Sequence, residues 1–238
     1  MLRVHSFESL AARDGEGLRY ALFLSGCPLR CAYCHNPDTW DGAVGTTYTT
    51  QELVKKIRRY LPYFRAGNGG VTLSGGEPLC QAEGVLELVL ALKNEGIHVT
   101  LDTSGALPMS DTVRAVIAAV DHVILDLKMP TDALYRRYTG GTLANTLAVL
   151  DASVTAKKRV WVRTVIVPTV NDSEAAVDDY LTLLAPYGTQ IERYELLPFH
   201  TLGFFKYEKL GVENPLADIP PMDRDALARL QQYVNKKR

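Results

Sequence analysis

The chain of 238 residues is 47% hydrophobic and 22% charged, a composition typical of a soluble globular protein whose core is large enough for one or two domains. Its formal net charge of −1 gives no general attraction to nucleic acid, so we expect no nucleic-acid partner. No stretch approaches about 18 uncharged apolar residues, and the charged residues 1–8 lack the apolar core of a signal peptide, so we expect a cytoplasmic protein without a membrane partner.

The first part of the chain contains a turn, a strand and a loop rich in cysteine. Gly15 and Gly17 predict a tight turn within residues 14–19. The apolar run over residues 21–24 predicts a short buried strand at residues 21–25, and a loop over residues 26–40 follows it. A helix is predicted from residue 51 to about 64, with Thr50 as its cap.

The rest of the chain alternates between strands and helices. Strands are predicted at residues 70–74, 97–101, 121–127, 159–167 and 190–197. Helices are predicted at residues 81–94, 111–119, 142–156, from a cap at 171–173 to about 184, and at 223–234. A looser stretch, residues 201–221, opens a C-terminal extension over residues 201–238.

The alternation predicts an α/β fold built from parallel βαβ units, and six rounds fit either an open doubly wound sheet or a barrel. We find no linker, repeat or low-complexity segment, so a single domain over residues 1–238 is expected. In such folds the carboxyl ends of the strands meet on one face, where functional sites are built. All six predicted strands end in polar or glycine-rich residues, namely the cysteine loop, Gly75 to Glu77, Asp102, Asp126 with Lys128, Arg163, and His200.

The cysteine loop places Cys27, Cys31 and Cys34 within eight residues. Thiolates are soft ligands that suit iron–sulfur clusters or zinc, and three of them leave one iron of a four-iron cluster open to a cofactor or substrate. The C-x3-C-x2-C spacing is the one that radical S-adenosylmethionine (SAM) enzymes use for their cluster. Alternatives are a haem-attachment motif at residues 31–35, which leaves Cys27 without a role, a thioredoxin-like pair, or a zinc site with His35 as fourth ligand. Cys80, the remaining cysteine, is expected to be a buried apolar residue at the start of a helix.

Each strand-end residue has a functional interpretation beside a structural one. The backbone of Gly75 and Gly76, with Glu77 nearby, suits the amino group of SAM; otherwise it is a strand-to-helix turn. Asp102 can meet a cation or a ribose hydroxyl, or can serve as a helix cap. Asp126 and Lys128 share strand parity and either form a structural ion pair or bind a cation and the methionine carboxylate, respectively.

Arg163, His200 and Tyr33 likewise each have a structural and a functional interpretation. Arg163 on a barrel strand needs an anion, which is either a protein carboxylate or a cofactor. His200 is either a loop histidine with internal partners or a hydrogen-bonding group for a ribose or carboxylate. Tyr33 lies between two of the cysteines and is either a packing residue or a platform for an adenine ring.

Taken together, these stretches resemble the glycyl radical enzyme activating enzymes of the radical SAM superfamily, most closely those of the pyruvate formate-lyase type. The resemblance covers nearly the whole chain and is carried by residues 5–8, 31–40, 74–77, 95–98, 101–103, 125–128, 160–163, 195–200, 202–203 and 206–207. It implies a partial (β/α)6 barrel with a [4Fe–4S] cluster on Cys27, Cys31 and Cys34. It also implies SAM contacts at Lys128, Arg163 and His200, and a monovalent cation at Asp102 and Asp126.

The resemblance further implies an activity and its partners. The reduced cluster would cleave SAM, and the 5′-deoxyadenosyl radical would remove a hydrogen atom from a backbone glycine of pyruvate formate-lyase, with flavodoxin or ferredoxin as electron donor. No side chain is required as a general acid or base, since the cluster and SAM carry the chemistry. The family's early loop reads Asp-Gly-Pro-Gly, whereas this chain has Glu16 at the third position, which leaves open an activase of another glycyl radical enzyme. A radical SAM enzyme acting on a small molecule and a non-enzymatic metal-binding module are the remaining alternatives.

Overall fold

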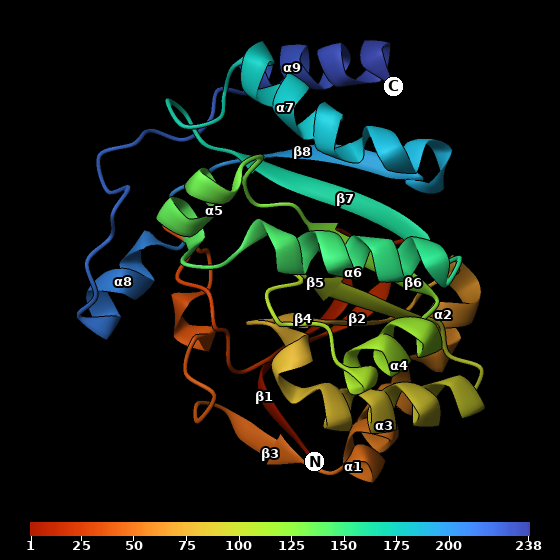
Figure 1. Ribbon diagram of the computed structural model, residues 1–238. Coiled ribbons are helices and arrows are strands. Elements are labelled where there is room, and N and C mark those ends of the chain that lie inside the picture. Colours follow the sequence, from red (N-terminus) through yellow and green to blue (C-terminus); the bar gives the residue numbers. More distant parts are fainter.

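The computed structural model describes residues 1–238 and places eight strands in one sheet, in the order β3-β1-β2-β4-β5-β6-β7-β8 (Figure 1). The strands are β1 Leu2–Ala11, β2 Arg19–Leu24, β3 Thr46–Tyr48, β4 Gly70–Gly75, β5 Val99–Thr103, β6 His122–Asp126, β7 Arg159–Ile166 and β8 Arg193–Pro198. Strand β2 and strands β4 to β8 run parallel to one another, which confirms the predicted α/β fold and its six parallel strands.

Two strands at one edge of the sheet were not predicted. Strand β1 pairs antiparallel with β2, and the three-residue β3 pairs antiparallel with β1. Beyond Val4 only Phe7 is an apolar residue that packs on the core, and the exposed positions Ser6, Glu8 and Ser9 are polar. The sequence therefore lacks the apolar alternation by which a strand is usually found.

The helices are α1 Thr50–Ile57, α2 Leu61–Gly67, α3 Ala82–Asn94, α4 Asp111–Ala119, α5 Asp132–Thr139, α6 Leu143–Thr155, α7 Glu174–Leu184, α8 Phe204–Leu210 and α9 Arg224–Lys237. The predicted helices beyond residue 80 are confirmed to within a few residues. Helices α5 and α8 were missed because each is only seven or eight residues long, too short to show a periodic pattern.

The predicted helix from residue 51 to 64 is in fact broken. Helix α1 ends at Ile57, and α2 begins at Leu61, because Pro62 has no N–H and fits only the first turn of a new helix. The predicted cap is also one residue off. Thr49 rather than Thr50 caps α1, since its hydroxyl accepts from Glu52 N at 3.2 Å while the Glu52 carboxylate accepts from Thr49 N at 2.8 Å.

The strands and helices form two layers around one continuous apolar core of 47 buried residues. Figure 1 shows α3, α4, α6 and α7 following one another along the outside of the sheet. Strands β3 and β8 are the two edges and do not pair with each other, so the six parallel strands form a partial barrel that stays open on one side. None of the helices is both long enough and apolar enough to cross a membrane.

Candidate functional site

The cysteine loop begins directly after β2, at the carboxyl end of the parallel strands. Gly26 adopts a φ of +96°, a value that favours glycine, and turns the chain out of the sheet. The two ends of the loop are bonded to each other, since Gly26 N donates to Thr39 O at 2.8 Å and Cys27 N donates to Trp40 O at 3.2 Å. The loop is thus a closed unit of fixed shape.

The three cysteines of the loop lie together and are not disulfide-bonded. Cys31 is buried against Leu29 and Ala106, and the half-buried Cys27 and Cys34 pack against the same small cluster. Burial raises the pKa of the Cys27 thiol to about 11 and that of Cys31 to about 12. Without a metal these groups are neutral thiols, and only metal coordination would make them thiolates.

No three His, Cys, Asp or Glu side chains converge as they would on a single metal ion. The three thiols of Cys27, Cys31 and Cys34 are one short of the four protein ligands that close a structural zinc site. Three thiolates match a four-iron cluster in which one iron has no protein ligand.

Helix α5 supports the cysteine loop from outside. Arg30 N donates to Thr139 O and Ala32 N donates to Tyr138 O, both at 2.8 Å. Tyr33 turns inward: its side chain is buried, and its hydroxyl donates to Lys128 O at 3.1 Å. In this position the ring ties the cysteine loop to the end of β6 and offers little surface on which an adenine could stack.

The glycine pair at the end of β4, Gly75 and Gly76, lies against the cysteine loop with no room for side chains. A Cβ on Gly75, whose φ is +116°, would lie 2.2 Å from Leu24 N, and a Cβ on Gly76 would lie 2.3 Å from Gly26 O. The amides of Gly76 and Glu77 donate to Leu24 O and Gly26 O, each at 2.8 Å. Since these N–H groups are used internally, carbonyl oxygens are what this turn can offer to a cationic amine.

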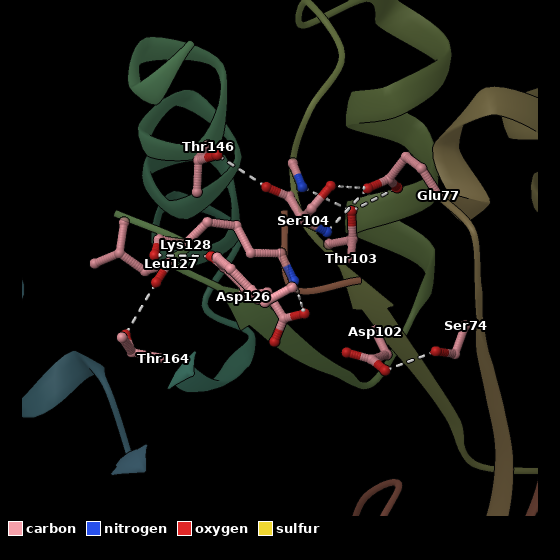
Figure 2. Close-up of polar contacts among 12 residues, drawn as sticks. Ser74, Glu77, Asp102, Thr103, Ser104, Asp126, Leu127, Lys128, Thr146 and Thr164 are labelled. Carbon is pink, nitrogen blue, oxygen red and sulfur yellow. Dashed lines mark hydrogen bonds and ion pairs between the residues drawn. The ribbon is translucent and has the colours of Figure 1, made fainter. Parts of the chain in front are cut away.

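Glu77 is fully buried, and its carboxylate binds the protein rather than an open site (Figure 2). Oε1 accepts from Leu79 N at 3.0 Å and from the Thr103 hydroxyl at 2.7 Å. Oε2 accepts from the Ser104 amide at 2.9 Å and from its hydroxyl at 2.6 Å. The carboxylate therefore joins the turn after β4 to the end of β5, so any role of Glu77 in cofactor binding is indirect.

The carboxylates of Asp102 and Asp126 face a common space at the ends of β5 and β6 (Figure 2). The Ser74 hydroxyl donates to Asp102 Oδ2 at 2.7 Å. Burial, reinforced by the charge of Asp126, raises the pKa of Asp102 to about 7. Two carboxylates held this close favour a cation or a proton between them.

Lys128 supplies the positive charge beside this pair, with Nζ 2.5 Å from Asp126 Oδ2. Burial is the largest single influence and would lower the pKa of Lys128, but the charge and hydrogen bond of Asp126, together with the nearby Cys31, outweigh it and the pKa is raised. The lysine is therefore charged at neutral pH, and its side chain keeps 16% of its surface exposed, enough for one further anionic partner.

Arg163 and His200 complete the row of predicted site residues. Arg163 lies opposite Asp126 on the neighbouring strand β7, where Nη2 donates to Arg13 O at 2.8 Å. Its Nε makes no hydrogen bond but lies 3.6 Å from a carboxylate oxygen of Glu195, so a protein carboxylate already faces the guanidinium. The exposed His200 follows β8, and its ring meets that of His35 edge-on with centroids 4.6 Å apart. Both side chains thus border the same face, His200 on the side of the cysteine loop.

Helix α8 holds the cysteine loop in a way that the sequence did not indicate. The buried Tyr207 donates its hydroxyl to Cys34 O at 3.0 Å. Lys206 Nζ donates to Asn36 Oδ1 at 2.8 Å and to Asp38 Oδ1 at 3.0 Å. The only available signal was that residues 206–207 belong to the stretches shared with the family, which gives no hint of their contacts.

The prediction for Cys80 was wrong, since its side chain is exposed. It lies in a short 3-10 turn, Pro78–Gln81, that precedes α3. In this turn Pro78 and Leu79 are the buried residues, whereas the side chain of Cys80 points out.

Comparisons with known proteins agree with this geometry. Residues 22–181 match the Radical SAM superfamily. The chain is 40% identical over 236 residues to the pyruvate formate-lyase-activating enzyme of Clostridium pasteurianum, covering 99% of this chain and 98% of that protein. It is 37% identical over 239 residues to the pyruvate formate-lyase 1-activating enzyme of Escherichia coli (strain K12), covering 98% and 97%. A radical SAM methyltransferase from Sphaerobacter thermophilus shares the fold with a TM-score of 0.64 at 18% identity, covering 99% of this chain and 75% of that one.

Proposed function

The chain belongs to the radical SAM superfamily, and from this membership we propose that it is the activating enzyme of a glycyl radical enzyme, namely pyruvate formate-lyase. The observation that carries the proposal is the three-cysteine loop, which lies at the strand ends beside the Asp102, Asp126 and Lys128 cluster, in a chain that matches such activating enzymes over almost its full length. One sheet and one main core support treating residues 1–238 as a single domain.

Cys27, Cys31 and Cys34 would hold the [4Fe–4S] cluster. When bound, the reduced cluster would supply the electron that splits a carbon–sulfur bond of SAM, the chemistry by which an activating enzyme of this kind would remove a hydrogen atom from a glycine of its partner. The closed loop ends and the hydrogen bonds from α5 and α8 keep the three thiols in place for this cluster.

The remaining residues bind and orient SAM. Carbonyl oxygens of Gly75 and Gly76 would accept from the amino group, and Lys128 would hold the carboxylate with Arg163 and His200 nearby. Asp102 and Asp126 would bind a monovalent cation, whose positive charge would offset the electrostatic repulsion between the two carboxylates. Glu77 and Tyr33 would not contact SAM themselves. Glu77 holds the turn after β4 in place, and Tyr33 holds the cysteine loop. No side chain serves as a general acid or base.

The partners follow from the same proposal. The protein substrate is a glycyl radical enzyme, and a flavodoxin or ferredoxin supplies electrons in the cytoplasm. Pyruvate formate-lyase is preferred over another glycyl radical enzyme because both curated relatives carry that name. Glu16, where the family has proline, extends its carboxylate to Arg159 Nη1 at 2.5 Å, so a different partner stays the second candidate. A small-molecule substrate is the least supported, since both relatives act on a protein by name.

Electron paramagnetic resonance tests the proposal directly. The reconstituted and reduced protein is mixed with SAM and pyruvate formate-lyase, and a glycyl doublet that requires SAM is expected. Cleavage of SAM without a doublet would reject pyruvate formate-lyase as partner and move the search to other glycyl radical enzymes. Failure to bind iron and sulfide, or to cleave SAM, would reject the radical SAM assignment itself.

A further inference from the structure

Exposed apolar side chains gather on one short segment of the surface. Four of the nine exposed large apolar residues lie in α8 and its flanks, namely Leu202, Phe205, Leu210 and Val212. Leu202 is 73% exposed and Phe205 is 53% exposed. We call Leu202 and Phe205 the α8 patch. A run of exposed apolar side chains on one short segment is the kind of surface that a partner protein covers.

The opposite side of α8 is bonded to the cysteine loop. Tyr207 and Lys206 face that loop through the bonds to Cys34, Asn36 and Asp38, and Gly203 lies so close to His35 that a Cβ would be 2.5 Å from its carbonyl oxygen. Figure 1 shows α8 outside the sheet, beside the loop that contains residues 37–39. One helix, about 10 Å across, therefore separates the α8 patch from the cluster ligands.

We propose that the α8 patch is where the electron-donor protein docks, an inference that rests on the proposed function. A hydrogen atom moves only between groups in contact, so the partner glycine must enter the open face of the barrel where SAM binds. An electron needs no contact and can cross a single helix. The face of α8 that points away from the cysteine loop thus suits electron delivery and cannot present a glycine to the cofactor.

The size and charge of the surface fit such a donor. Electron-transfer complexes are small, with less than about 1,200 Å² of total buried surface, so one short helix and its flank can supply much of the contact. Lys209 places its ammonium 5.0 Å from the Phe205 ring. Glu208 lies on the same helix, so we expect Lys209 to steer an acidic donor rather than to dominate its affinity.

The step itself is a single electron transfer. The flavin hydroquinone of reduced flavodoxin loses one electron and becomes the semiquinone, while the [4Fe–4S] cluster goes from the 2+ to the 1+ state. No bond forms or breaks between the two proteins, so the only contribution of this surface is to bring the two redox groups close together.

Stopped-flow absorbance on the holoenzyme tests the proposal. The double variant Leu202→Ser with Phe205→Ser is expected to slow cluster reduction by flavodoxin hydroquinone about tenfold, with reduction by dithionite unchanged. Lys209→Gln is expected to slow the flavodoxin reaction only at low salt. The matched control is Leu90→Ser, which alters a 51% exposed residue on α3 and should behave like wild type.

Three results would overturn the proposal. Equal slowing with dithionite would mean that the patch supports the cluster itself. Unchanged reduction by flavodoxin would mean that no donor docks there. Normal reduction followed by slow glycyl radical formation would assign the patch to the protein substrate instead. Wild-type SAM cleavage with dithionite, measured alongside, separates a failure of this inference from a failure of the proposed function.

Discussion

Glu77 gives the sharpest test of how the site is built, because its carboxylate accepts four hydrogen bonds at a fully buried position. Glu77→Gln keeps the shape but replaces one acceptor oxygen by an NH2 group. Each carboxylate oxygen accepts from one hydroxyl and one backbone N–H. A hydroxyl can rotate to accept from the new NH2 group, but a backbone N–H cannot, so one buried amide loses its partner in either orientation of the glutamine.

The expected cost follows from this count. An unpaired buried N–H costs about 1–3 kcal/mol, and the remaining bonds lose their charge assistance. We expect Glu77→Gln to lower the free energy of unfolding by about 3 kcal/mol, which for a chain of this size corresponds to a fall in Tm of about 6–12 °C. Glu77→Ala removes every acceptor and should cost about 5 kcal/mol.

Urea unfolding of the metal-free protein provides the measurement, with Glu87→Gln as control because its carboxylate is largely exposed and makes only a 3.8 Å contact with the N-terminal amine. The control is expected to stay within about 0.5 kcal/mol of wild type. The reasoning fails if Glu77→Gln is as stable as wild type and the reconstituted variant binds SAM more than tenfold less tightly. That outcome would make the carboxylate a direct cofactor ligand.

Three further predictions concern the cysteine loop and the charged cluster beside it. Cys31→Ala is expected to abolish cluster assembly, measured as bound iron and sulfide, whereas Cys80→Ala retains both; a full cluster in the first variant would refute the ligand assignment. Lys128→Ala leaves Asp126 without its cation and should weaken SAM binding at least about 30-fold by equilibrium dialysis, and an unchanged affinity would contradict its role. In the metal-free protein the pKa of Asp102 is raised from an ordinary 3.8 to about 7, so between these pH values the folded state carries a proton on Asp102 that the unfolded state has lost. The free energy of unfolding should therefore fall by up to about 4 kcal/mol as the pH rises from about 4 to 7, and Asp102→Asn should remove this slope; equal slopes in both proteins would exclude Asp102 as its source.

Much of the fold follows from local signals. The six parallel strands are buried apolar runs, and helices such as α3 and α4 begin and end at residues whose own side chains or φ values mark the boundary, as Ser110 and Gly96 do. Elements stabilised mainly by distant contacts were missed. Strand β1 depends on pairing with β2, and α5 and α8 are short helices that pack against the cysteine loop.

The sequence by itself determined the chemistry, because thiolate spacing, polar strand ends and the order of βαβ units are all local or periodic properties that parallel topology then gathers on one face. It also identified Asp126 and Lys128 as neighbours, since alternate residues of a strand point to the same side. The directions of the other side chains were decided by tertiary structure alone. Glu77 and Tyr33 face protein donors and acceptors far away in the chain, and Tyr207 reaches Cys34 across 173 positions. Such partners carry no local periodicity, and only the packed fold places the buried carboxylate and hydroxyl groups where each finds its hydrogen bond.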